Sequence, residues 1–510
     1  MLFGELRKGI NIERIRGNAD DRDVIDVVYN SSGAKPNTVF VCVVGARSDG
    51  HDYAPDAYAK GCRIFVTSHE VDLPDDACVY FAENTRIALA ELSSAFFSHP
   101  SRELNVIGIT GTKGKTTTAL LVSGFLNSLG ESTGYIGSNG IDYAGKHYNT
   151  KNTTPESYDL HSCFRSMINA GVKTVVMEVS SQAVLMHRVH GIRFDTCVFT
   201  NLAHDHIGVG EHPTFENYRD CKARLFSDFG CRTMIYNAYD ANSEYMKASS
   251  SAEKYYSVSA QGEADLFATG VSSYRRDGML GVEFVLRAYD ESVKMSLPMA
   301  GDFNVENAIN AIAVCSSMIK SKRLSVSFDC DRDMLIAFRD ILAELSVDGR
   351  CQVVKNKYLP DRSFVIDYAH NGYSLSVVLQ LLRSYCPRRL ICLFGSVGER
   401  SFDRREELAT VASEYADVCI ITSDNPGEEP PEKIIGEMYS YCKENKDKVV
   451  CITDREEAIK YAVDISEQGD IILLAGKGHE DYQLIGKEKI PFSEKSLLAK
   501  FIKQKSAVTV

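Results

Sequence analysis

A glycine- and threonine-rich stretch from Gly108 to Thr118 places the strongest constraint on how this chain can fold. It follows the apolar run 104–109, which predicts a buried strand, and it precedes the apolar run 119–122, which predicts the first turns of a helix. A strand, a glycine turn and a helix start together form a phosphate cradle, because the backbone N–H groups at the helix start point at anions. The stretch therefore predicts a phosphate-binding loop in an α/β domain.

Three glycines, a lysine and a threonine account for the predicted chemistry of this loop. Gly108, Gly111 and Gly114 let the backbone approach phosphate oxygens. Lys115 adds a compact positive charge, and Thr116 has the hydroxyl position that ligates Mg²⁺. The loop is a variant of G-x-x-x-x-G-K-[ST], since the spacing from Gly108 to Gly114 is one residue longer. The alternative is a glycine turn that only joins a strand to a helix.

The length and charge of the chain limit its partners. Its 510 residues suffice for about three domains of ordinary size, and the formal net charge of -12 argues against nucleic-acid binding. The N-terminus lacks the form of a signal peptide, and no apolar run approaches the roughly 18 residues of a spanning helix. We expect a cytoplasmic protein without a membrane partner. The 15 cysteines form no C-x-x-C pair, so we expect them to be reduced and mostly buried.

Alternating strand and helix patterns predict three domains. Residues 1–103 predict a small α/β domain with strands at 38–44 and 63–67, a glycine-bounded loop at 45–52 and a linker at 97–102. Residues 104–345 predict a central domain with a mainly parallel sheet. Residues 346–510 predict a Rossmann-like domain with strands at 364–367, 390–395, 418–422 and 471–476.

Two strands of the central domain end in polar segments. The strand at 174–179 contains Glu178, and the strand at 196–200 is followed by Asn201 to His206. Ligands of a doubly wound sheet lie beyond the carboxyl ends of its strands, so we expect these segments to face the same crevice as the phosphate loop. The alternative for Glu178 is a solvated charge at a strand end.

Taken together, the strand-end loops resemble those of the Mur ligase family, most closely of its MurE type. The resemblance covers the whole chain, and the segments that carry it are 110–117, 153–155, 178–181, 205–206, 301–304, 367–370, 424–426 and 476–480. It implies ATP-dependent amide bond formation in peptidoglycan synthesis through an acyl-phosphate intermediate. It also implies the use of Mg²⁺, ATP, UDP-N-acetylmuramoyl-L-alanyl-D-glutamate and a diamino acid. We expect a monomer.

The resemblance assigns catalytic, metal and nucleotide roles to particular residues. It makes Lys115, Lys222, His206 and Glu178 catalytic, and it makes Thr116, Glu178, His206 and Lys222 the metal ligands, with Lys222 carried as a carbamate. Without the resemblance, Lys222 would be read as a surface lysine on a helix. The expected ATP contacts are Gly111, Thr112, Lys113, Gly114, Lys115, Thr116, Thr117, Asn304, Arg350 and His370.

The resemblance also assigns residues to the other two substrates. The UDP-substrate contacts are Ser31 with the Gly45 to His51 loop, and Thr153, Thr154, Ser180 and Arg188. The amino acid contacts are Arg400, Asp424, Asn425, Gly476 and Glu480. The chain departs from the family's usual pattern at Asn30 and Met186.

The identity of the added amino acid depends on Gly427. Relatives that add meso-diaminopimelate typically have an arginine here, whose guanidinium can hold the distal carboxylate. Because Gly427 offers no such group and two glutamates follow it, we expect L-lysine, with ornithine second. The alternatives are meso-diaminopimelate held by Arg404 or Arg405, another ligase of the superfamily such as a folylpolyglutamate synthase or a cyanophycin synthetase-like enzyme, and a regulatory phosphate-loop protein.

Overall fold

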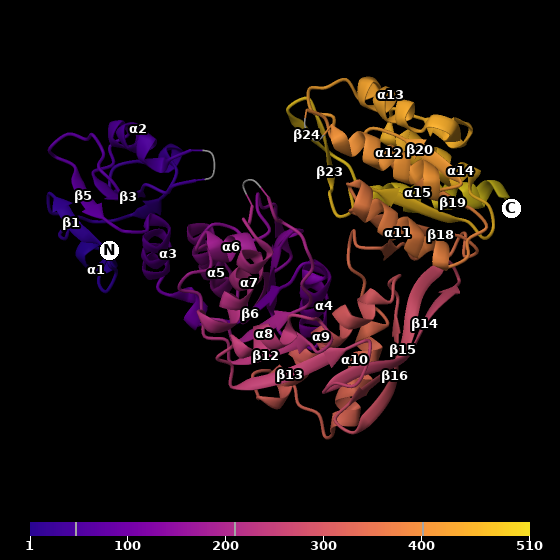
Figure 1. The fold of residues 1–510 in the computed structure, drawn as a ribbon, viewed down its shortest axis with the longest axis horizontal. Helices are drawn as coiled ribbons and strands as arrows, with labels where there is room; N and C mark the ends of the chain where they lie inside the picture. Colours follow the sequence, from indigo (N-terminus) through magenta and orange to yellow (C-terminus); the bar gives the residue numbers. More distant parts are fainter. Residues whose placement is uncertain (46–47, 209–210, 400–401, 510) are drawn as a thin grey trace. The chain divides into compact units, whose positions relative to one another are not determined.

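The structure is a computed structural model that describes residues 1–45, 48–208, 211–399 and 402–509. The chain divides into two compact units. Unit 1 contains residues 1–259, 263–266 and 310–328, and unit 2 contains residues 260–262, 267–309 and 329–510. Figure 1 labels the elements of both units. Within the described ranges, no helix has both the length and the apolar composition to cross a membrane.

Unit 1 starts with a small sheet in the order β1–β5–β4–β3–β2, in which only the β1–β5 pair is antiparallel. Helix α3 covers one face and helix α2 the other, and each packs on its own apolar cluster. The predicted small α/β domain is therefore confirmed. Its elements are α1 (Phe3–Leu6), β1 (Glu13–Arg16), β2 (Asp26–Val28), β3 (Thr38–Val41), α2 (Ala54–Ala59), β4 (Ile64–Thr67), β5 (Cys78–Phe81) and α3 (Thr85–Phe96).

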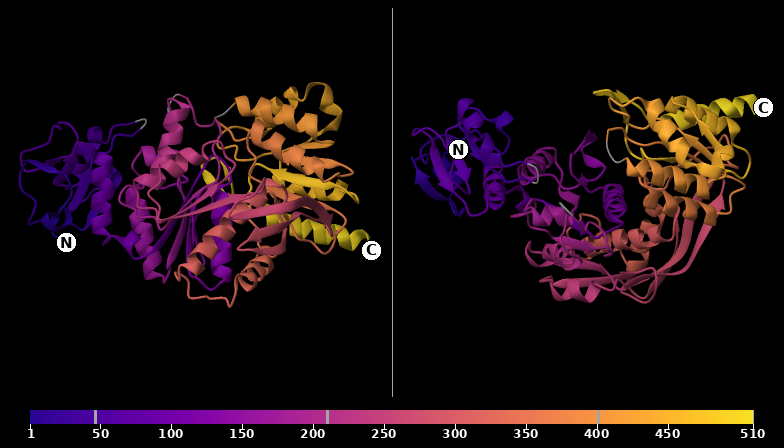
Figure 2. Two further views of the ribbon diagram at one scale, coloured as in Figure 1. Left: turned by 60° about the horizontal axis from the view of Figure 1, so that its bottom comes forward. Right: turned by 45° about the horizontal axis from the view of Figure 1, so that its top comes forward.

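The central sheet of unit 1 has the order β13–β12–β11–β6–β10–β7–β8–β9. Its pairs are parallel from β13 to β7, and β8 and β9 add an antiparallel edge. The left view of Figure 2 shows its strands running side by side. Its elements are β6 (Asn105–Thr110), α4 (Lys115–Ser128), β7 (Thr133–Gly137), β8 (Gly140–Tyr143), β9 (Lys146–Tyr148), α5 (Ser157–Asn169), β10 (Thr174–Glu178), α6 (Ser181–Leu185), β11 (Thr196–Phe199), α7 (Phe215–Ser227), β12 (Thr233–Asn237), α8 (Ser243–Ala248) and β13 (Lys254–Ser259).

Helices cover both faces of this sheet, which explains the continuous apolar runs of its strands. Helix α4 packs on β7, β10 and β6, while α5 and α7 share an apolar cluster that includes Phe164 and Phe226. Gly108 lies inside β6, where a Cβ would come within 2.7 Å of the Phe194 ring. The prediction that Gly108 belongs to the phosphate cradle is therefore wrong, because this glycine makes room for an aromatic ring.

The C-terminal sheet of unit 2 has the order β17–β18–β22–β19–β20–β21, and its pairs are parallel except β17–β18. Helices α11, α12 and α13 cover one face, and α14 and α15 cover the other. This doubly wound arrangement confirms the Rossmann-like prediction. Its elements are β17 (Gln352–Val353), β18 (Ser363–Asp367), α11 (Gly372–Ser384), β19 (Leu390–Phe394), α12 (Asp403–Tyr415), β20 (Val418–Ile421), α13 (Pro431–Tyr441), β21 (Val449–Cys451), α14 (Arg455–Ile465), β22 (Ile471–Ala475) and α15 (Glu494–Thr509).

Three further strands, a hairpin and two helices complete the fold. The strands have the order β16–β15–β14, with β15 and β16 antiparallel, and the hairpin pairs β23 with β24. Their bounds are β14 (Leu266–Arg276), β15 (Met279–Ala288), β16 (Glu291–Leu297), α9 (Phe303–Lys320), α10 (Asp331–Leu342), β23 (Tyr482–Ile485) and β24 (Glu488–Pro491).

Candidate active site

The phosphate loop joins the end of β6 to the start of α4, as predicted. Gly111 and Gly114 have φ angles of 149° and 82°, and a Cβ at residue 111 would lie 2.0 Å from Thr200 Oγ1. The Thr112 N–H donates to the Asn201 carbonyl oxygen at 2.8 Å. The loop is thus held against the end of β11, and it depends on glycine for both its conformation and its space.

Two lysine amines meet at one carbonyl oxygen of this loop. Lys115 Nζ donates to Gly111 O at 2.9 Å, and Lys222 Nζ, from α7, donates to the same oxygen at 2.9 Å. Lys222 is only 2% exposed. Burial, and after it the charge of Lys115, holds the pKa of Lys222 well below its usual value. Burial thus disfavours the charged form of the Lys222 amine, and the neutral amine is the form that reacts with carbon dioxide to give a carbamate.

Glu178 ends β10 with a wholly buried side chain. Its carboxylate accepts hydrogen bonds from Thr116 Oγ1 at 2.9 Å, from Tyr135 OH at 2.9 Å and from Ser138 N at 2.8 Å. Ser138 Oγ lies 3.0 Å from Thr153 Oγ1. Ser138 Oγ donates to it as well, at 3.5 Å, so every one of these donors is neutral. In the part of the chain that the structure describes, Glu178 forms no ion pair. A buried carboxylate without a counter-charge fits a site for a hard divalent cation.

His206 lies on the loop after β11. Its side chain is 53% exposed, and Nδ1 is 3.2 Å from Glu211 Oε1. Its ring centroid is 6.0 Å from that of Tyr218. Among the residues described, it contacts neither Glu178 nor Lys222. The structure therefore brings together three of the four predicted metal ligands, Thr116, Glu178 and Lys222, around the phosphate loop and leaves His206 apart from them.

Tyr218 is a buried neighbour of the site that the sequence did not single out. Its hydroxyl lies 3.1 Å from Thr112 Oγ1, and its ring centroid lies 4.5 Å from Lys222 Nζ. Burial raises the pKa of Tyr218 to about 12, so the phenol stays neutral. Its position four residues before Lys222 on α7 was the available signal, because residues four apart share a helix face.

The predicted substrate residues lie at the same sheet edge. Thr154 Oγ1 donates to the backbone oxygen of Glu178 at 2.9 Å, and it accepts from Ser180 N at 3.1 Å. Arg188 Nη1 donates to Thr154 O at 3.2 Å. Thr154, Ser180 and Arg188 therefore form one connected group beside Glu178.

A hollow of about 420 Å³ lies beside the small sheet of unit 1. Glu156 joins it to the substrate group, since its carboxylate is 3.2 Å from Arg86 Nη1 and 2.8 Å from Arg188 Nε. The hollow contains the predicted Ser31 and much of the predicted glycine loop, of which residues 46 and 47 lie outside the described ranges. Its lining residues are Tyr29, Asn30, Ser31, Phe40, Val43, Gly45, Ser48, Gly50, Tyr53, Arg86 and Glu156.

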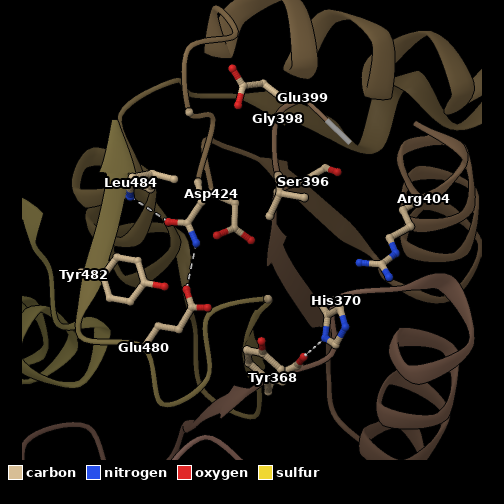
Figure 3. A pocket seen from close by; sticks show the side chains of 15 residues that line it. Tyr368, His370, Ser396, Gly398, Glu399, Arg404, Asp424, Glu480, Tyr482 and Leu484 are labelled. Carbon is tan, nitrogen blue, oxygen red and sulfur yellow. Dashed lines mark hydrogen bonds between the residues drawn. The ribbon is translucent and has the colours of Figure 1, made fainter. Parts of the chain in front are cut away.

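Unit 2 has a pocket of about 640 Å³ at the carboxyl ends of its parallel strands (Figure 3). The predicted residues Asp424, Asn425, Gly476 and Glu480 all line it. Asn425 Nδ2 donates to Glu480 Oε2 at 2.9 Å. The lining residues are Tyr368, His370, Gly395, Ser396, Val397, Gly398, Glu399, Arg404, Asp424, Asn425, Gly427, Gly476, Glu480, Tyr482 and Leu484.

Lys477 organises one side of this pocket from a wholly buried position. Its Nζ donates to Asn425 Oδ1 at 3.0 Å, and it lies 3.4 Å from Asp424 Oδ1 and 3.2 Å from Glu480 Oε2. A buried cation among three acceptors fixes their side chains. The sequence did not identify this role, although a lysine between two glycines at a strand end was a signal.

The predicted nucleotide contacts of unit 2 fall into two places. Arg350 Cζ lies 5.2 Å from the ring centroid of Tyr368, and His370 Nδ1 lies 2.8 Å from Tyr368 O. Arg350 and His370 therefore flank one aromatic residue of the pocket. Asn304, in the first turn of α9, donates to Ala300 O at 2.7 Å. In the described part of unit 2, it touches neither of the other two.

Glu428 and Glu429, which follow Gly427, do not line the pocket. Glu429 Oε2 is 2.6 Å from Arg405 Nη2, and this hydrogen bond is the main reason that the pKa of Glu429 is lowered to about 2. Glu428 Oε1 is 3.3 Å from Lys487 Nζ. The predicted acidic neighbourhood for a lysine ammonium is wrong, because cations of the chain itself neutralise both carboxylates. The predicted Arg400 lies outside the described residues.

Family models match three successive parts of the chain. Residues 25–99 match the model described as Mur ligase family, catalytic domain. Residues 109–315 match the Mur ligase middle domain, and residues 349–478 match the Mur ligase, glutamate ligase domain. The expected boundaries after residues 103 and 345 stay predictions.

Curated relatives and solved structures are similar over almost the full length. A UDP-N-acetylmuramoyl-L-alanyl-D-glutamate–2,6-diaminopimelate ligase of Clostridium perfringens is 34% identical, covering 98% of this chain and 99% of the relative. A ligase of the same name from Caldanaerobacter subterraneus is 35% identical, with the same coverage. A solved structure bearing this name is 25% identical, with a TM-score of 0.68 and 99% of both chains covered.

Proposed function

This chain belongs to the Mur ligase family, and we propose that it joins 2,6-diaminopimelate to UDP-N-acetylmuramoyl-L-alanyl-D-glutamate. The family makes it an ATP-dependent ligase of peptidoglycan synthesis. The relatives at 34% and 35% identity are both named as 2,6-diaminopimelate ligases. These names favour the alternative raised from the sequence over L-lysine.

The observation that carries the ligase chemistry of this proposal is the meeting of Lys115 and Lys222 at Gly111 O, on the loop whose Thr116 donates to the buried Glu178. A carboxylate is a poor acyl donor, so it is activated by the γ-phosphoryl group of ATP before an amine attacks the acyl-phosphate. Lys115 neutralises the phosphoryl group during transfer. Thr116, Glu178 and Lys222 as a carbamate would hold Mg²⁺, which offsets phosphate charge when bound. His206 stays a ligand predicted from the resemblance.

The remaining predicted residues bind and orient the substrates. Ser31 and its hollow receive the uridine end, and Thr153, Thr154, Ser180 and Arg188 receive the end that carries the reacting carboxylate. Asn304, Arg350 and His370 stay nucleotide contacts predicted from the resemblance. Within unit 2, Asp424, Asn425, Gly476 and Glu480 hold the α-amino acid end. The cytoplasmic location and the monomeric state also stay predictions.

Product analysis with three amino acids tests the proposal. Purified protein with Mg²⁺, ATP and the UDP-dipeptide receives meso-diaminopimelate, L-lysine or L-ornithine, and phosphate release is measured together with the product mass. We expect the highest kcat/KM with meso-diaminopimelate. A higher kcat/KM with L-lysine would establish the second candidate, which Gly427 favours because it supplies no guanidinium.

A further inference from the structure

The distal carboxylate of diaminopimelate needs a cationic partner. Residue 427, where relatives that add diaminopimelate typically have an arginine, is a glycine in this chain. Compared with lysine, diaminopimelate has one additional carboxylate at its distal end, and a carboxylate that enters a pocket requires a cationic partner. Gly427 has a φ of 61°, and a Cβ there would lie 3.0 Å from Glu399 Oε2. The carboxylate of Glu399 therefore occupies the space into which a side chain at residue 427 would extend.

Among the described residues, two neighbouring arginines of α12 are the candidates, and they differ in burial and in partners. Arg404 and Arg405 stand in the first turn of the helix, where successive side chains point about 100° apart. Arg405 is 1% exposed, and its guanidinium donates to Glu429 at 3.1 and 2.6 Å and also to Glu437. The Arg405 guanidinium is therefore already paired in the protein interior and does not bind a ligand in the pocket. Arg404 is half-buried and lines the pocket.

The guanidinium of Arg404 is available to a ligand. Among the described residues no hydrogen bond or ion pair engages it, although Glu399, Asp424 and Glu480 line the same pocket. Two of these acids, Asp424 and Glu480, already have Lys477 as their cation. Figure 3 shows the Arg404 side chain reaching into the pocket on the side opposite Glu480 and Tyr482.

The pocket thus has two charged ends. One end is formed by Asn425 and Glu480, which the resemblance assigns to the α-amino acid group, together with Lys477. Arg404 stands across the pocket from Glu480. We propose that Arg404 is the specificity-determining residue for the amino acid, and that its guanidinium holds the distal carboxylate of diaminopimelate by paired charge-assisted hydrogen bonds. This inference rests on the proposed function, because L-lysine has no such carboxylate.

The contact between Arg404 and the distal carboxylate is tested by substituting Arg404 and, in parallel, changing the amino acid substrate. L-Lysine is diaminopimelate without the distal carboxylate, so enzyme and ligand changes form a closed cycle. We expect Arg404→Ala to lower kcat/KM for meso-diaminopimelate about 10- to 100-fold and to leave that for L-lysine within about twofold. Arg404→Lys should lie between wild type and Arg404→Ala with diaminopimelate, because it keeps the charge but loses the planar fork.

Controls separate this role from a structural one. Arg339→Ala removes a half-buried arginine of α10, which is absent from the pocket lining, and should leave kcat/KM for both amino acids unchanged. The melting temperature and the KM for ATP of Arg404→Ala should match those of wild type. Equal losses with both amino acids, or an unchanged preference for diaminopimelate, would overturn the role of Arg404. A wild-type preference for L-lysine would instead overturn the proposed function, so the two failures are distinguishable.

Discussion

The phosphate loop of unit 1 and the amino acid pocket of unit 2 both lie at the carboxyl ends of parallel strands, but they are built differently. The loop is one contiguous segment whose backbone forms the phosphate cradle. Lys115 of the loop, Lys222 of α7 and Glu178 of β10 already have partners in the chain. The pocket is assembled from the ends of several strands and from α12, and Arg404 extends into it with no partner among the described residues.

The difference teaches where specificity can change. A site made from backbone must keep its glycines, so its chemistry stays the same while substrates differ. A pocket made from side chains of separate elements can exchange one cation for another from a different element. If Arg404 holds the distal carboxylate, a cation of α12 has replaced the arginine that relatives typically have at residue 427.

The largest expected effect tests the phosphate loop. Lys115→Ala should lower kcat at least about 100-fold, because one charge on the transferring phosphoryl group is worth a few kcal/mol of transition-state stabilisation. Turnover is measured by phosphate release, and the melting temperature serves as the folding control. Near-normal turnover in a folded variant would remove the basis for treating this loop as the catalytic region.

A second prediction sharpens the contrast through Lys222. Lys222→Ala should nearly silence the enzyme, and a small carboxylic acid such as acetate should restore part of the activity by filling the vacated anion position. In ¹³C-labelled carbon dioxide, wild type should show a carbamate carbon signal that Lys222→Ala lacks. A fully active wild type without this signal would contradict the carbamate.

Two glycine substitutions compare the regions directly. Gly111→Ala should cost about 2 kcal/mol of stability and most of the activity, because its Cβ would lie 2.0 Å from Thr200 Oγ1. Gly427→Ala should cost only about 1 kcal/mol, since its φ is 61° and Glu399 lies 3.0 Å from the new Cβ. Thermal unfolding and kcat/KM measure both variants. A larger loss of activity in Gly427→Ala would reverse the comparison.

The smallest expected effect is the pH dependence of the Arg405–Glu429 pair. The folded pKa of Glu429 is lowered to about 2 from its ordinary 4.5, so the carboxylate contributes stability above pH 4.5 that is lost as the pH falls toward 2. Glu429→Gln should therefore lower the melting temperature more at pH 7 than at pH 3. The same decrease in melting temperature at both pH values would show that the charge of Glu429 does not contribute to stability.

Elements made from contiguous residues were predictable from the sequence. The strand predicted at 471–476 is observed at Ile471–Ala475, and the one predicted at 174–179 at Thr174–Glu178, because strands buried on both faces have continuous apolar runs. The phosphate loop was equally accessible, since glycines, lysine and threonine follow one another along the chain.

Side-chain directions could not be predicted in this way. Glu428 and Glu429 follow Gly427 in sequence, yet Lys487 and Arg405 bind them away from the pocket. Gly108 was read as part of the cradle because the sequence does not reveal that Phe194 packs against it. These errors share a cause, since each depends on a partner that is remote in the sequence.

Glu178 faces two sites at once. Its carboxylate accepts from Thr116 of the phosphate loop, while its backbone oxygen accepts from Thr154 of the substrate group. A ligand that moves Glu178 at one of these sites therefore also moves a hydrogen-bond partner of the other site. Thermodynamic reciprocity then requires that the factor by which nucleotide changes the affinity for the UDP-dipeptide equals the factor by which the UDP-dipeptide changes the affinity for nucleotide.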